Sequence, residues 1–483
     1  MARPIGWLCI CIGIAGLAGC AGKVPLAAPP PAVAMPAGWG AGESAHGETA
    51  HREPRPAQAL DPDWWNRFGS AELARLVREG QGSNLELAAA LSRVRQAEAQ
   101  ARIAGVSLLP TVDFGSGFDR ALPIGNGSSS VSASAQLQVA YEVDFWGKNK
   151  AGVAAAAAAL DANREDRQTV ALTVTSAIVS TYLEVLSLHD RLEAARAHVA
   201  NAEHVLVLVK AQRSAGAASP LDLARQRSVV AGQKAAIPEL QQQAREAQSA
   251  LAILLGRAPQ SFRIADQGLE TIDLPDVTPG LPSDLLARRP DIRRAEANLL
   301  AADANVAVAR AALFPNIRLT GALGAQSSAL LSLLNAPNLL ANVSASLMTP
   351  IFDAGRLKTE RDLAIARKQE LVQVYRAAVF NALSEVGIVL GQIRSLDEQR
   401  KLKTVELEET RLAFDLSEIR YKGGAEDLMT VLDTQRAVAD VQNELGILKL
   451  KRLQATVSLF KALGGGWQAD APPDRAPSRA PSA

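Results

Sequence analysis

The chain has 483 residues, of which 48% are hydrophobic and 21% are charged, with 51 basic against 50 acidic side chains. That share of charged residues excludes a polytopic helical membrane protein. The balanced net charge, with no cluster of basic and aromatic residues, argues against a nucleic-acid-binding protein.

The N-terminus has the pattern of a secretory signal followed by a lipid attachment site. Residues 1–19 carry one charge, Arg3, and an apolar run that is too short to span a membrane as a helix. The run ends in Leu17-Ala18-Gly19-Cys20, which resembles the lipobox of bacterial lipoproteins, in which the signal is removed and the cysteine is acylated. The alternative is an ordinary signal peptide followed by an incidental cysteine.

The residues after this signal predict an outer-membrane lipoprotein with a flexible tether. Ala21 is not the aspartate that retains many lipoproteins at the inner membrane, so we expect sorting to the outer membrane. Cys9 and Cys11 leave with the signal, and no disulfide framework or thiolate metal site can be built from Cys20 alone. From residue 20 to 62 the chain is rich in Ala, Pro and Gly, which predicts a tether without a core. Folded structure should begin near Trp64-Trp65.

Two pairs of long β-strands are predicted, each after an amphipathic helix that stops at a proline, Pro110 or Pro315. Residues 111–118 alternate as a first strand, and 131–145 keep a period of two over fifteen residues. A strand needs only ~9–11 residues to cross a bilayer, so the second is long enough to cross it. The second pair is predicted at 316–324 and 342–351.

Each strand pair is followed by a very long helix and a shorter return helix. No Gly or Pro occurs between Gly152 and Gly216, and apolar residues recur there at the four-three spacing of a coiled-coil seam: Val174, Ile178, Thr181, Val185, Leu188, Leu192, Ala195, Val199, Ala202, Leu206 and Val209. Ser219-Pro220 starts the return helix, and Pro238 is expected to kink or divide it. The second long helix has a less regular seam, interrupted by Glu409: Leu402, Val405, Leu412, Leu416 and Ile419.

The same order of elements occurs twice along the chain. Gly424 follows Gly216 by 208 residues, and Gly464 follows Gly256 by the same separation. Two copies of one unit therefore make the chain. The predicted organisation is a signal peptide (1–19), a tether (20–62), a first repeat (63–256), a connector (257–283), a second repeat (284–464) and a disordered tail (465–483).

These elements predict a membrane protein that is incomplete as a single copy. Four strands cannot close a membrane barrel, whose smallest members have ~8, and an open sheet edge is not tolerated in lipid. Several copies must therefore pool their strands around a polar lumen. The aromatic residues at the helix-side strand ends form either an interfacial belt or local packing: Phe145, Trp146, Phe314 and Phe352. The long helices then continue the conduit, or form a filled bundle.

The motifs together resemble those of a known family. The lipobox at Cys20, the two helix stops before strand pairs, Arg289-Pro290-Asp291-Ile292, and Tyr421 with Gly424 and Asp433 resemble the outer membrane factors of tripartite efflux systems. The resemblance is greatest to the lipoprotein branch that works with resistance-nodulation-division pumps, and it covers Trp64 to Leu463. It implies an α+β membrane protein: a homotrimer with a twelve-stranded transmembrane β-barrel, four strands per chain, continued by a hollow periplasmic α-barrel.

The resemblance also implies a function and partners. These are passive export of small toxic or amphiphilic compounds, a periplasmic adaptor and an inner-membrane resistance-nodulation-division transporter. The periplasmic end closes in such families through polar contacts near the helix-turn-helix tips. Carried over by position, the gate residues are Asp222, Tyr421, Lys422, Asp433 and, at an apolar constriction, Met429. Some members carry a second acidic residue where this chain has Thr430, so a gate with two acidic rings is not expected.

The residue chemistry alone gives these positions a second interpretation. Three copies of Asp433 around an axis would form a ring that attracts cations, and a Tyr hydroxyl or Lys ammonium reaching Asp222 or Asp433 would hold the gate closed. Alternatively, these are solvated charges at helix ends. The turns Ala215-Gly216-Ala217 and Gly423-Gly424-Ala425 resemble the adaptor-docking turns of the family, with ordinary helix C-caps as the alternative.

The sequence contains no enzymatic signature that we can identify. It has no His-Glu-x-x-His, no phosphate-binding glycine loop and no nucleophile elbow. His189, His198 and His204 share one helix, but their spacing does not align them as metal ligands, and we interpret them as surface or lumen residues. No cofactor or metal is expected. The rival hypotheses are a lipid-anchored periplasmic coiled-coil scaffold and a lipid-anchored enzyme.

Overall fold

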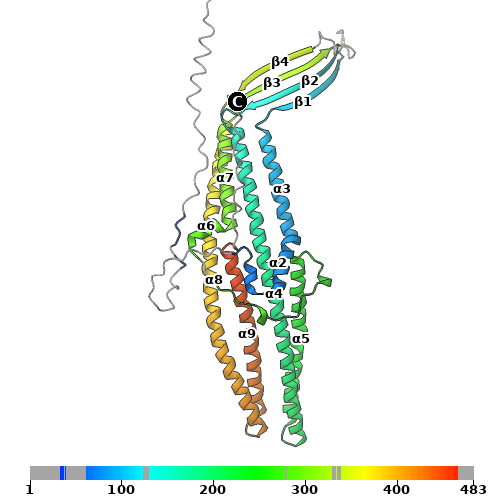
Figure 1. Cartoon of the computed structure of the whole chain (residues 1–483), viewed down its shortest axis with the longest axis vertical. Coiled ribbons are helices and arrows are strands. Elements are labelled where there is room, and N and C mark those ends of the chain that lie inside the picture. The colour runs from blue at the N-terminus through cyan, green and yellow to red at the C-terminus, as the bar shows by residue number, and fades with distance from the viewer. Residues whose placement is uncertain are drawn as a thin grey trace, which may run out of the picture. The chain divides into compact units, whose positions relative to one another are not determined.

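The structure is a computed structural model, and it describes residues 33–36, 38–39, 61–122, 130–277, 280–328, 333 and 339–465 (Figure 1). The predicted signal peptide, Cys20, most of the tether and the tail from residue 466 lie outside the described residues. The chain divides into two compact units. Unit 1 includes Ser92–Glu165 and Ile292–Ala378, and unit 2 includes Ala34–Leu91, Asp166–Asp291 and Val379–Ala483.

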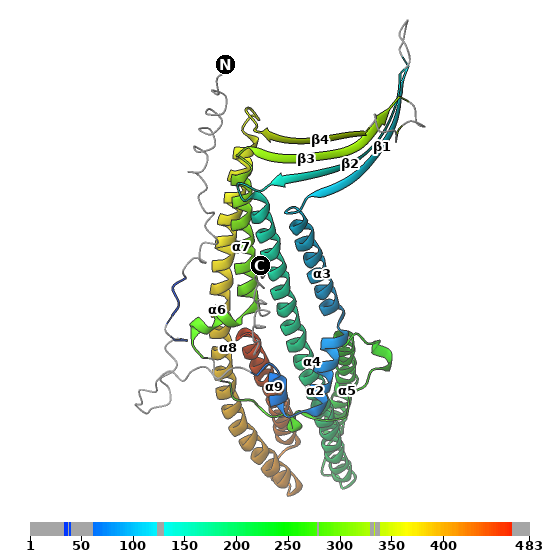
Figure 2. The ribbon, with the colours of Figure 1, turned by 45° about the horizontal axis from the view of Figure 1, so that its top comes forward.

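Unit 1 contains one antiparallel sheet of four strands in the order β1-β2-β3-β4. The strands lie side by side in a curved sheet (Figure 2): β1 (Thr111–Ala121), β2 (Ser130–Val143), β3 (Asn316–Ser327) and β4 (Leu339–Met348). The two predicted strand pairs are therefore present. They join through β2 and β3, with Leu137 opposite Leu323, so β1 and β4 are the outer strands of the sheet.

The strand ends differ from the prediction for local reasons. β2 stops at Val143 rather than residue 145 because the carboxylate of Asp144 turns away to accept hydrogen bonds from the backbone N–H groups of Asn149 and Lys150, at 2.9 and 2.8 Å. β4 spans 339–348 rather than 342–351, and Pro350, which has no N–H to donate to a ladder, follows its end. β1 is longer than predicted.

The helices of unit 1 are α3 (Leu85–Val106, from Ser92), α7 (Pro290–Ala311, from Ile292) and the first parts of two long helices. Their buried positions are mostly alanine, including Ala97, Ala162 and Ala302, which allows close helix packing. Ion pairs across helices add to this packing, for example Lys368 with Asp303 at 2.5 Å.

Unit 2 contains the ends of two helical hairpins (Figure 1). In each, a helix of 67 residues turns back into a helix of 35 residues: α4 (Lys148–Ser214) with α5 (Pro220–Leu254), and α8 (Arg356–Lys422) with α9 (Leu428–Ala462). Pro238 lies inside α5 without dividing it, which leaves a kink as the remaining alternative of the prediction. By length and composition alone α4 and α8 are apolar enough to cross a membrane, but the core helix of a soluble protein meets the same criterion.

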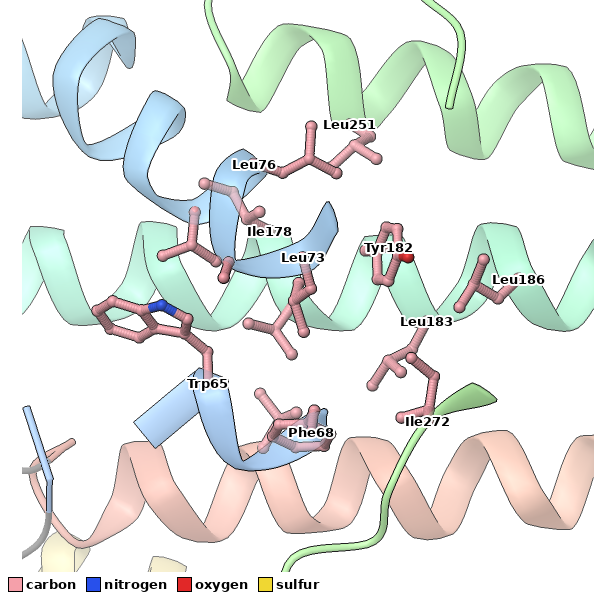
Figure 3. Close-up of a cluster of buried hydrophobic side chains, with 14 of the residues drawn as sticks. Trp65, Phe68, Leu73, Leu76, Ile178, Tyr182, Leu183, Leu186, Leu251 and Ile272 are labelled. Carbon is pink, nitrogen blue, oxygen red and sulfur yellow. The ribbon is translucent and has the colours of Figure 1, made fainter. Parts of the chain in front are cut away.

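The core of unit 2 joins segments far apart in the sequence (Figure 3). The short helix η1 (Trp64–Phe68) and α2 (Ala71–Ser83) pack against α4, α9 and Ile272 of the connector. Trp64 stacks on Phe460 with ring centroids 4.8 Å apart and an interplanar angle of 19°. Full burial of such side chains stabilises by ~1.5–3 kcal/mol each. Trp64 and Trp65 are both buried in this core, and Trp39 donates a hydrogen bond to the carbonyl of Gly280 at 2.7 Å.

The two return helices end at similar junctions. The amide of Asn84 donates to the carbonyl of Leu254 at 2.8 Å, and the guanidinium of Arg289 donates to the carbonyl of Ala462 at 3.0 Å. Arg289 is buried and also contacts both carboxylate oxygens of Asp291, at 3.0 and 2.6 Å, and Glu385 at 2.7 Å. A neutral amide therefore closes one junction and an ion-pair network closes the other.

The two long helices bury different kinds of stripe. The predicted seam of α4 lies mostly inside the chain, with Ile178 and Val209 fully buried. The predicted stripe of α8 is exposed: Leu402 63%, Val405 56%, Leu412 54%, Leu416 51% and Ile419 65%. Toward its tip, α8 instead turns a mixed polar and apolar stripe inward, which includes Lys403, Leu407, Thr410, Phe414, Ser417 and Tyr421. The apolar stripe of α8 therefore does not make its contact with α9.

Candidate functional site

The register of the sheet separates most apolar from most polar side chains, with Ser116, Arg120 and Ser327 as exceptions on the apolar face and Leu340 and Met348 on the polar face. Because partners directly opposite each other point to the same face, the pairing extends the alternation of each strand over the whole sheet. One face carries Val112, Phe114, Phe118, Leu137, Val139, Tyr141, Val143, Ile317, Leu319, Leu323, Ala341, Val343 and Leu347. The other carries Asp113, Asp119, Ser132, Ser134, Gln136, Gln138, Glu142, Arg318, Thr320, Gln326, Asn342, Ser344 and Ser346.

The apolar face is not covered by other described parts of the chain. Val343 is 90% exposed and Phe114 is 70% exposed. Contiguous exposed apolar surface of this kind marks a membrane or protein contact. The polar face is held by its own contacts, such as the hydrogen bond between the hydroxyls of Thr320 and Ser344 at 2.7 Å and the ion pair of Glu142 with Lys148 at 3.2 Å.

The aromatic residues at the strand ends form a local cluster. Trp146 stacks on Phe314 with centroids 4.6 Å apart, contacts Phe145 edge-on at 4.8 Å, and donates its indole N–H to the carbonyl of Pro315 at 2.8 Å. Phe352, by contrast, is 89% exposed. The first three residues pack on one another, but Phe145 and Phe314 remain about half exposed, so both the belt and the local-packing interpretations stay open.

The two predicted docking turns have the same backbone. Gly216 and Gly424 have φ of 79° and 75°, and the next residues, Ala217 and Ala425, donate backbone hydrogen bonds to Gln212 and Arg420 at 2.8 and 2.9 Å. This is the Schellman helix ending, in which glycine takes the left-handed position. The C-cap interpretation is therefore correct as geometry. Ala215, Gly216 and Ala217 are exposed, as are Gly423, Gly424 and Ala425, so both turns remain accessible to a partner.

Each return helix begins with hydrogen bonds between a hydroxyl residue and an aspartate three residues apart. The hydroxyl residue is the N-cap of α5, and the aspartate is the N-cap of α9. In α5 the hydroxyl of Ser219 accepts from the backbone of Asp222 at 3.1 Å, and the Asp222 carboxylate accepts from the Ser219 backbone at 2.9 Å. In α9 the carboxylate of Asp427 accepts from both the backbone and the hydroxyl of Thr430, each at 2.9 Å. Hydrogen bonds from Ser219 lower the pKa of Asp222, and those from Thr430 lower the pKa of Asp427. Asp222 therefore caps its own helix within this chain.

Tyr421 lies at the centre of a small cluster near the tips. It is buried among Val205 and Val209 of α4 and Leu428 and Val431 of α9, so it connects the two hairpins. Burial, and then the nearby carboxylate of Asp222, raises the pKa of the Tyr421 hydroxyl. The carboxylate of Asp222 is therefore close enough to influence the Tyr421 hydroxyl, but among the described residues its hydrogen bonds go to Ser219, and the gate contact stays a prediction.

The other predicted gate residues do not meet in one chain. Lys422 pairs with Glu418 at 2.9 Å rather than with Asp222 or Asp433. Asp433 is exposed, and no described residue forms a hydrogen bond or ion pair with it. Met429 is 38% exposed, beside the buried Leu428. Any contact of Asp433 or Met429 across a gate must therefore come from another copy of the chain.

Several polar residues near the tips were not singled out from the sequence. Glu418 also lies 3.7 Å from His204, and Ser417 shares a hydrogen bond of 2.9 Å with Thr434. Glu418 and Lys422 are four residues apart on one helix, a spacing that predicts the pair. Asp427 directly precedes an apolar run, which is the usual signal of an N-cap. No comparable local signal predicts the contact of Ser417 with Thr434, which joins two helices.

The three histidines of α4 differ in their surroundings. The side chain of His204 is 70% exposed and that of His189 is 27% exposed, but the Nε2 atom of His198 is buried without a hydrogen-bond partner among the described residues. His198 as a whole is half-buried and lines two pockets, so its interpretation as a surface or lumen residue stays a prediction. Among the described residues, no group of three or more His, Cys, Asp or Glu is arranged to hold a metal ion.

The described features together are those of a transport protein. They comprise a sheet with one exposed apolar face, long paired helices, accessible hairpin turns and acidic residues near the tips. Transfer of a molecule along such surfaces needs no covalent chemistry, and Asp222, Asp427, Lys422 and Glu418 near the tips are engaged in helix caps or ion pairs.

Comparison with known proteins identifies the family. A family model described as outer membrane efflux protein matches residues 76–257 and 281–465. The chain is 42% identical over 452 residues to the pyoverdine export outer membrane protein OpmQ of Pseudomonas putida, covering 91% of this chain and 94% of that protein. It is 31% identical over 409 residues to the cation efflux system protein CusC of Escherichia coli, covering 84% and 88%.

The solved structure of the outer-membrane channel OprN superposes with a TM-score of 0.81 at 26% identity, covering 91% of this chain and 100% of that chain. The chain therefore belongs to the outer membrane efflux protein family, whose members are outer membrane channels rather than enzymes. The predicted family, location and transport function are confirmed.

Proposed function

We propose that three copies of this chain form a twelve-stranded β-barrel in the outer membrane, to which each contributes its four-stranded sheet. The observation that carries this proposal is the continuous apolar face of the sheet together with its two outer strands, β1 and β4. Lipid covers the apolar face, and pairing of β1 with β4 of the next copy removes both open edges. The polar face then lines an aqueous lumen.

The helices continue this conduit as a periplasmic α-barrel. The exposed apolar stripe of α8, from Leu402 to Ile419, supplies the surface on which a neighbouring copy packs. The equal lengths of the two long helices and of the two return helices support two tandem repeats, with boundaries at 63–256 and 284–464.

A lipid on Cys20 anchors each copy after removal of residues 1–19. The tether from 20 to 62 connects this anchor to the folded part. Mass spectrometry of the mature N-terminus tests this arrangement, because acylation adds a defined mass to Cys20 and a Cys20→Ser variant lacks it. An unmodified mature protein that begins elsewhere contradicts the proposal.

The periplasmic end is gated near the hairpin tips. Tyr421 buried between the hairpins, with Asp222 nearby, holds the hairpins of one copy together, while three copies of Asp433 form a ring and Met429 lies at the constriction. Lys422, paired with Glu418, supports the last turn of α8. Tyr421→Phe combined with Asp433→Ala should raise single-channel conductance in planar bilayers. Unchanged conductance removes both residues from the gate.

The exposed turns 215–217 and 423–425 dock a periplasmic adaptor, which links the channel to an inner-membrane resistance-nodulation-division transporter. Small residues there let another helical hairpin approach closely. Replacing Ala217 and Ala425 by tryptophan should block crosslinking to the adaptor while channel formation is retained. Normal crosslinking in that variant contradicts docking at the turns.

The cargo is a small compound that the pump delivers, and an iron-chelating molecule of the pyoverdine class is the first to test. The relative at 42% identity carries pyoverdine export in its name, and the polar lumen face suits a polar cargo. Expression of this chain in Pseudomonas putida lacking that relative should restore pyoverdine in the medium. Failure to restore it, with trimers present in the outer membrane, excludes this cargo.

A single experiment separates the channel from the scaffold alternative. A channel should run as a detergent-resistant trimer and give steps of ionic conductance in bilayers. A periplasmic scaffold should instead be released from membranes by salt or urea without detergent once the Cys20 anchor is removed, and should give no conductance.

A further inference from the structure

Two cavities with both polar and apolar linings adjoin each other between the hairpins of unit 2. The larger, of about 500 Å³, is lined by α4, α5, α9 and the connector, and the smaller, of about 260 Å³, by all four hairpin helices. Both are lined by His198, Gln233, Ala439 and Gln442. The cavities therefore meet at the side chain of His198, where the two hairpins approach each other.

The polar groups at this meeting point are not fully satisfied. The Nε2 atom of His198 and the Oε1 atom of Gln435 are buried and have no hydrogen-bond partner among the described residues. A buried polar atom without a partner costs ~1–3 kcal/mol, so groups of this kind weaken an interface that depends on their burial. Gln435 lines the smaller cavity with His198.

The charged groups around His198 come from every packed element. Asp440 lies on α9, Arg411 and Asp415 on α8, and Glu239 on α5. The other charged residues of the larger cavity have partners elsewhere. The guanidinium of Arg191 donates to Asn443 at 3.0 Å, Lys449 pairs with Glu270 at 2.7 Å, and the carboxylate of Asp190 accepts from the backbone N–H of Leu269 at 2.9 Å. Burial lowers the pKa of His198, and the opposing effect of Asp440 is smaller.

We propose that His198 makes the packing of the two hairpins sensitive to protons, so that acidification loosens α4 from α9 along these cavities. The packed arrangement favours the neutral imidazole because it buries the Nε2 atom away from water without giving it a hydrogen-bond partner among the described residues. When the hairpins separate, the ring is hydrated and regains its ordinary basicity. The separated state therefore binds a proton below about pH 6.5 that the packed state does not bind, and its population rises as the pH falls.

A second histidine on the same helix acts in the opposite direction. His204 is exposed and lies 3.7 Å from Glu418 of α8, so its protonation adds an attraction between α4 and α8. Because this pair is exposed to solvent, its contribution is the weaker one. His204 is therefore a matched control for His198.

Hydrogen exchange tests the proposal on the full mature chain in detergent. Exchange of the amides in residues 195–202 and 435–442 is compared between wild type and His198→Asn at pH 7.5 and at pH 5.5. Comparison at one pH cancels the intrinsic pH dependence of exchange. We expect equal rates at pH 7.5, and exchange ~3-fold or more faster in wild type at pH 5.5, where only the wild type takes up the proton.

Two further variants make the outcome decisive. His204→Asn should retain the acid response or enlarge it, whereas Asp440→Asn should move the response to lower pH because it removes the carboxylate that favours protonation. Equal rates in wild type and His198→Asn at both pH values overturn the proposal, as does an acid response that persists in His198→Asn. The proposal goes beyond the export function, and exchange tests it even if the purified protein gives no conductance.

Discussion

The two hairpins have helices of equal length but bury their apolar residues differently. The seam of α4 is buried within the chain, whereas the apolar stripe of α8 is exposed and α8 turns Lys403, Thr410 and Ser417 inward instead. The first hairpin therefore completes its packing within one copy. In the second hairpin the apolar stripe of α8 from Leu402 to Ile419 remains exposed. This difference indicates that α8, rather than α4, is the helix that contacts another copy of the chain.

The largest expected effect comes from placing charge on the exposed stripe. Val405→Glu with Leu412→Glu should abolish trimers, because two charges per copy would be buried at each contact between copies. Native mass spectrometry in detergent measures the oligomer.

Thr404→Glu is the control for this variant, since residue 404 is exposed on the same helix but lies outside the stripe. It should leave the trimer intact. Stable trimers in the double variant would show that the stripe of α8 does not face another copy.

The next largest effect is a difference in the free energy of unfolding between variants at the C-terminal ends of α9 and α5. Arg289→Met removes a buried cation that joins Asp291, Glu385 and the carbonyl of Ala462, and should lower the free energy of unfolding by ~2–4 kcal/mol. Asn84→Ala removes a neutral hydrogen bond from the corresponding position and should lower it by ~1–2 kcal/mol. Differential scanning calorimetry compares the two variants, and equal losses would contradict the distinction between them.

The hairpin turns should respond equally, because their backbones match. Gly216→Ala and Gly424→Ala each force a side chain into the left-handed region and should cost ~1 kcal/mol. Gly232→Ala is the control: Gly232 lies inside α5 with open space around its Cβ position, so alanine there should stabilise by ~0.5–1 kcal/mol. Thermal unfolding distinguishes the opposite signs.

The smallest effect near neutral pH concerns the caps of α5 and α9. The pKa values of Asp222 and Asp427 are lowered in the folded chain, so their caps stabilise the tips above about pH 4 and are lost as the pH falls through the lowered values. Pepsin cleavage at the tips should be slow at pH 4 and faster at pH 2. Asp222→Asn should remove this dependence at the first tip only, leaving the second as an internal control.

The sequence was most informative where one residue determines local geometry. Alternation predicted all four strands, and Gly216 and Gly424 marked both turns because few other residues adopt their backbone conformation. It did not predict the partner of the α8 stripe, since periodicity identifies an apolar face but not what covers it. The contacts of Arg289 and the burial of the Nε2 atom of His198 were also missed, because both depend on segments far away in the chain. The predicted gate could not be tested within one copy, because Asp222 caps its own helix, Lys422 pairs with Glu418, and contacts of Asp433 across an axis depend on other copies.

The matched helix lengths limit how such a chain can change. A residue inserted into an α-helix rotates everything beyond it by about 100° and shifts it by ~1.5 Å along the axis. One residue inserted in α4 but not in α8 would displace the turn at 215–217 along the helix axis relative to the turn at 423–425. It would also rotate the side chains of the first turn to a different face of the hairpin. The lengths of the two hairpins are therefore constrained together. Insertions and deletions should accumulate instead in the loops between strands and in the tether.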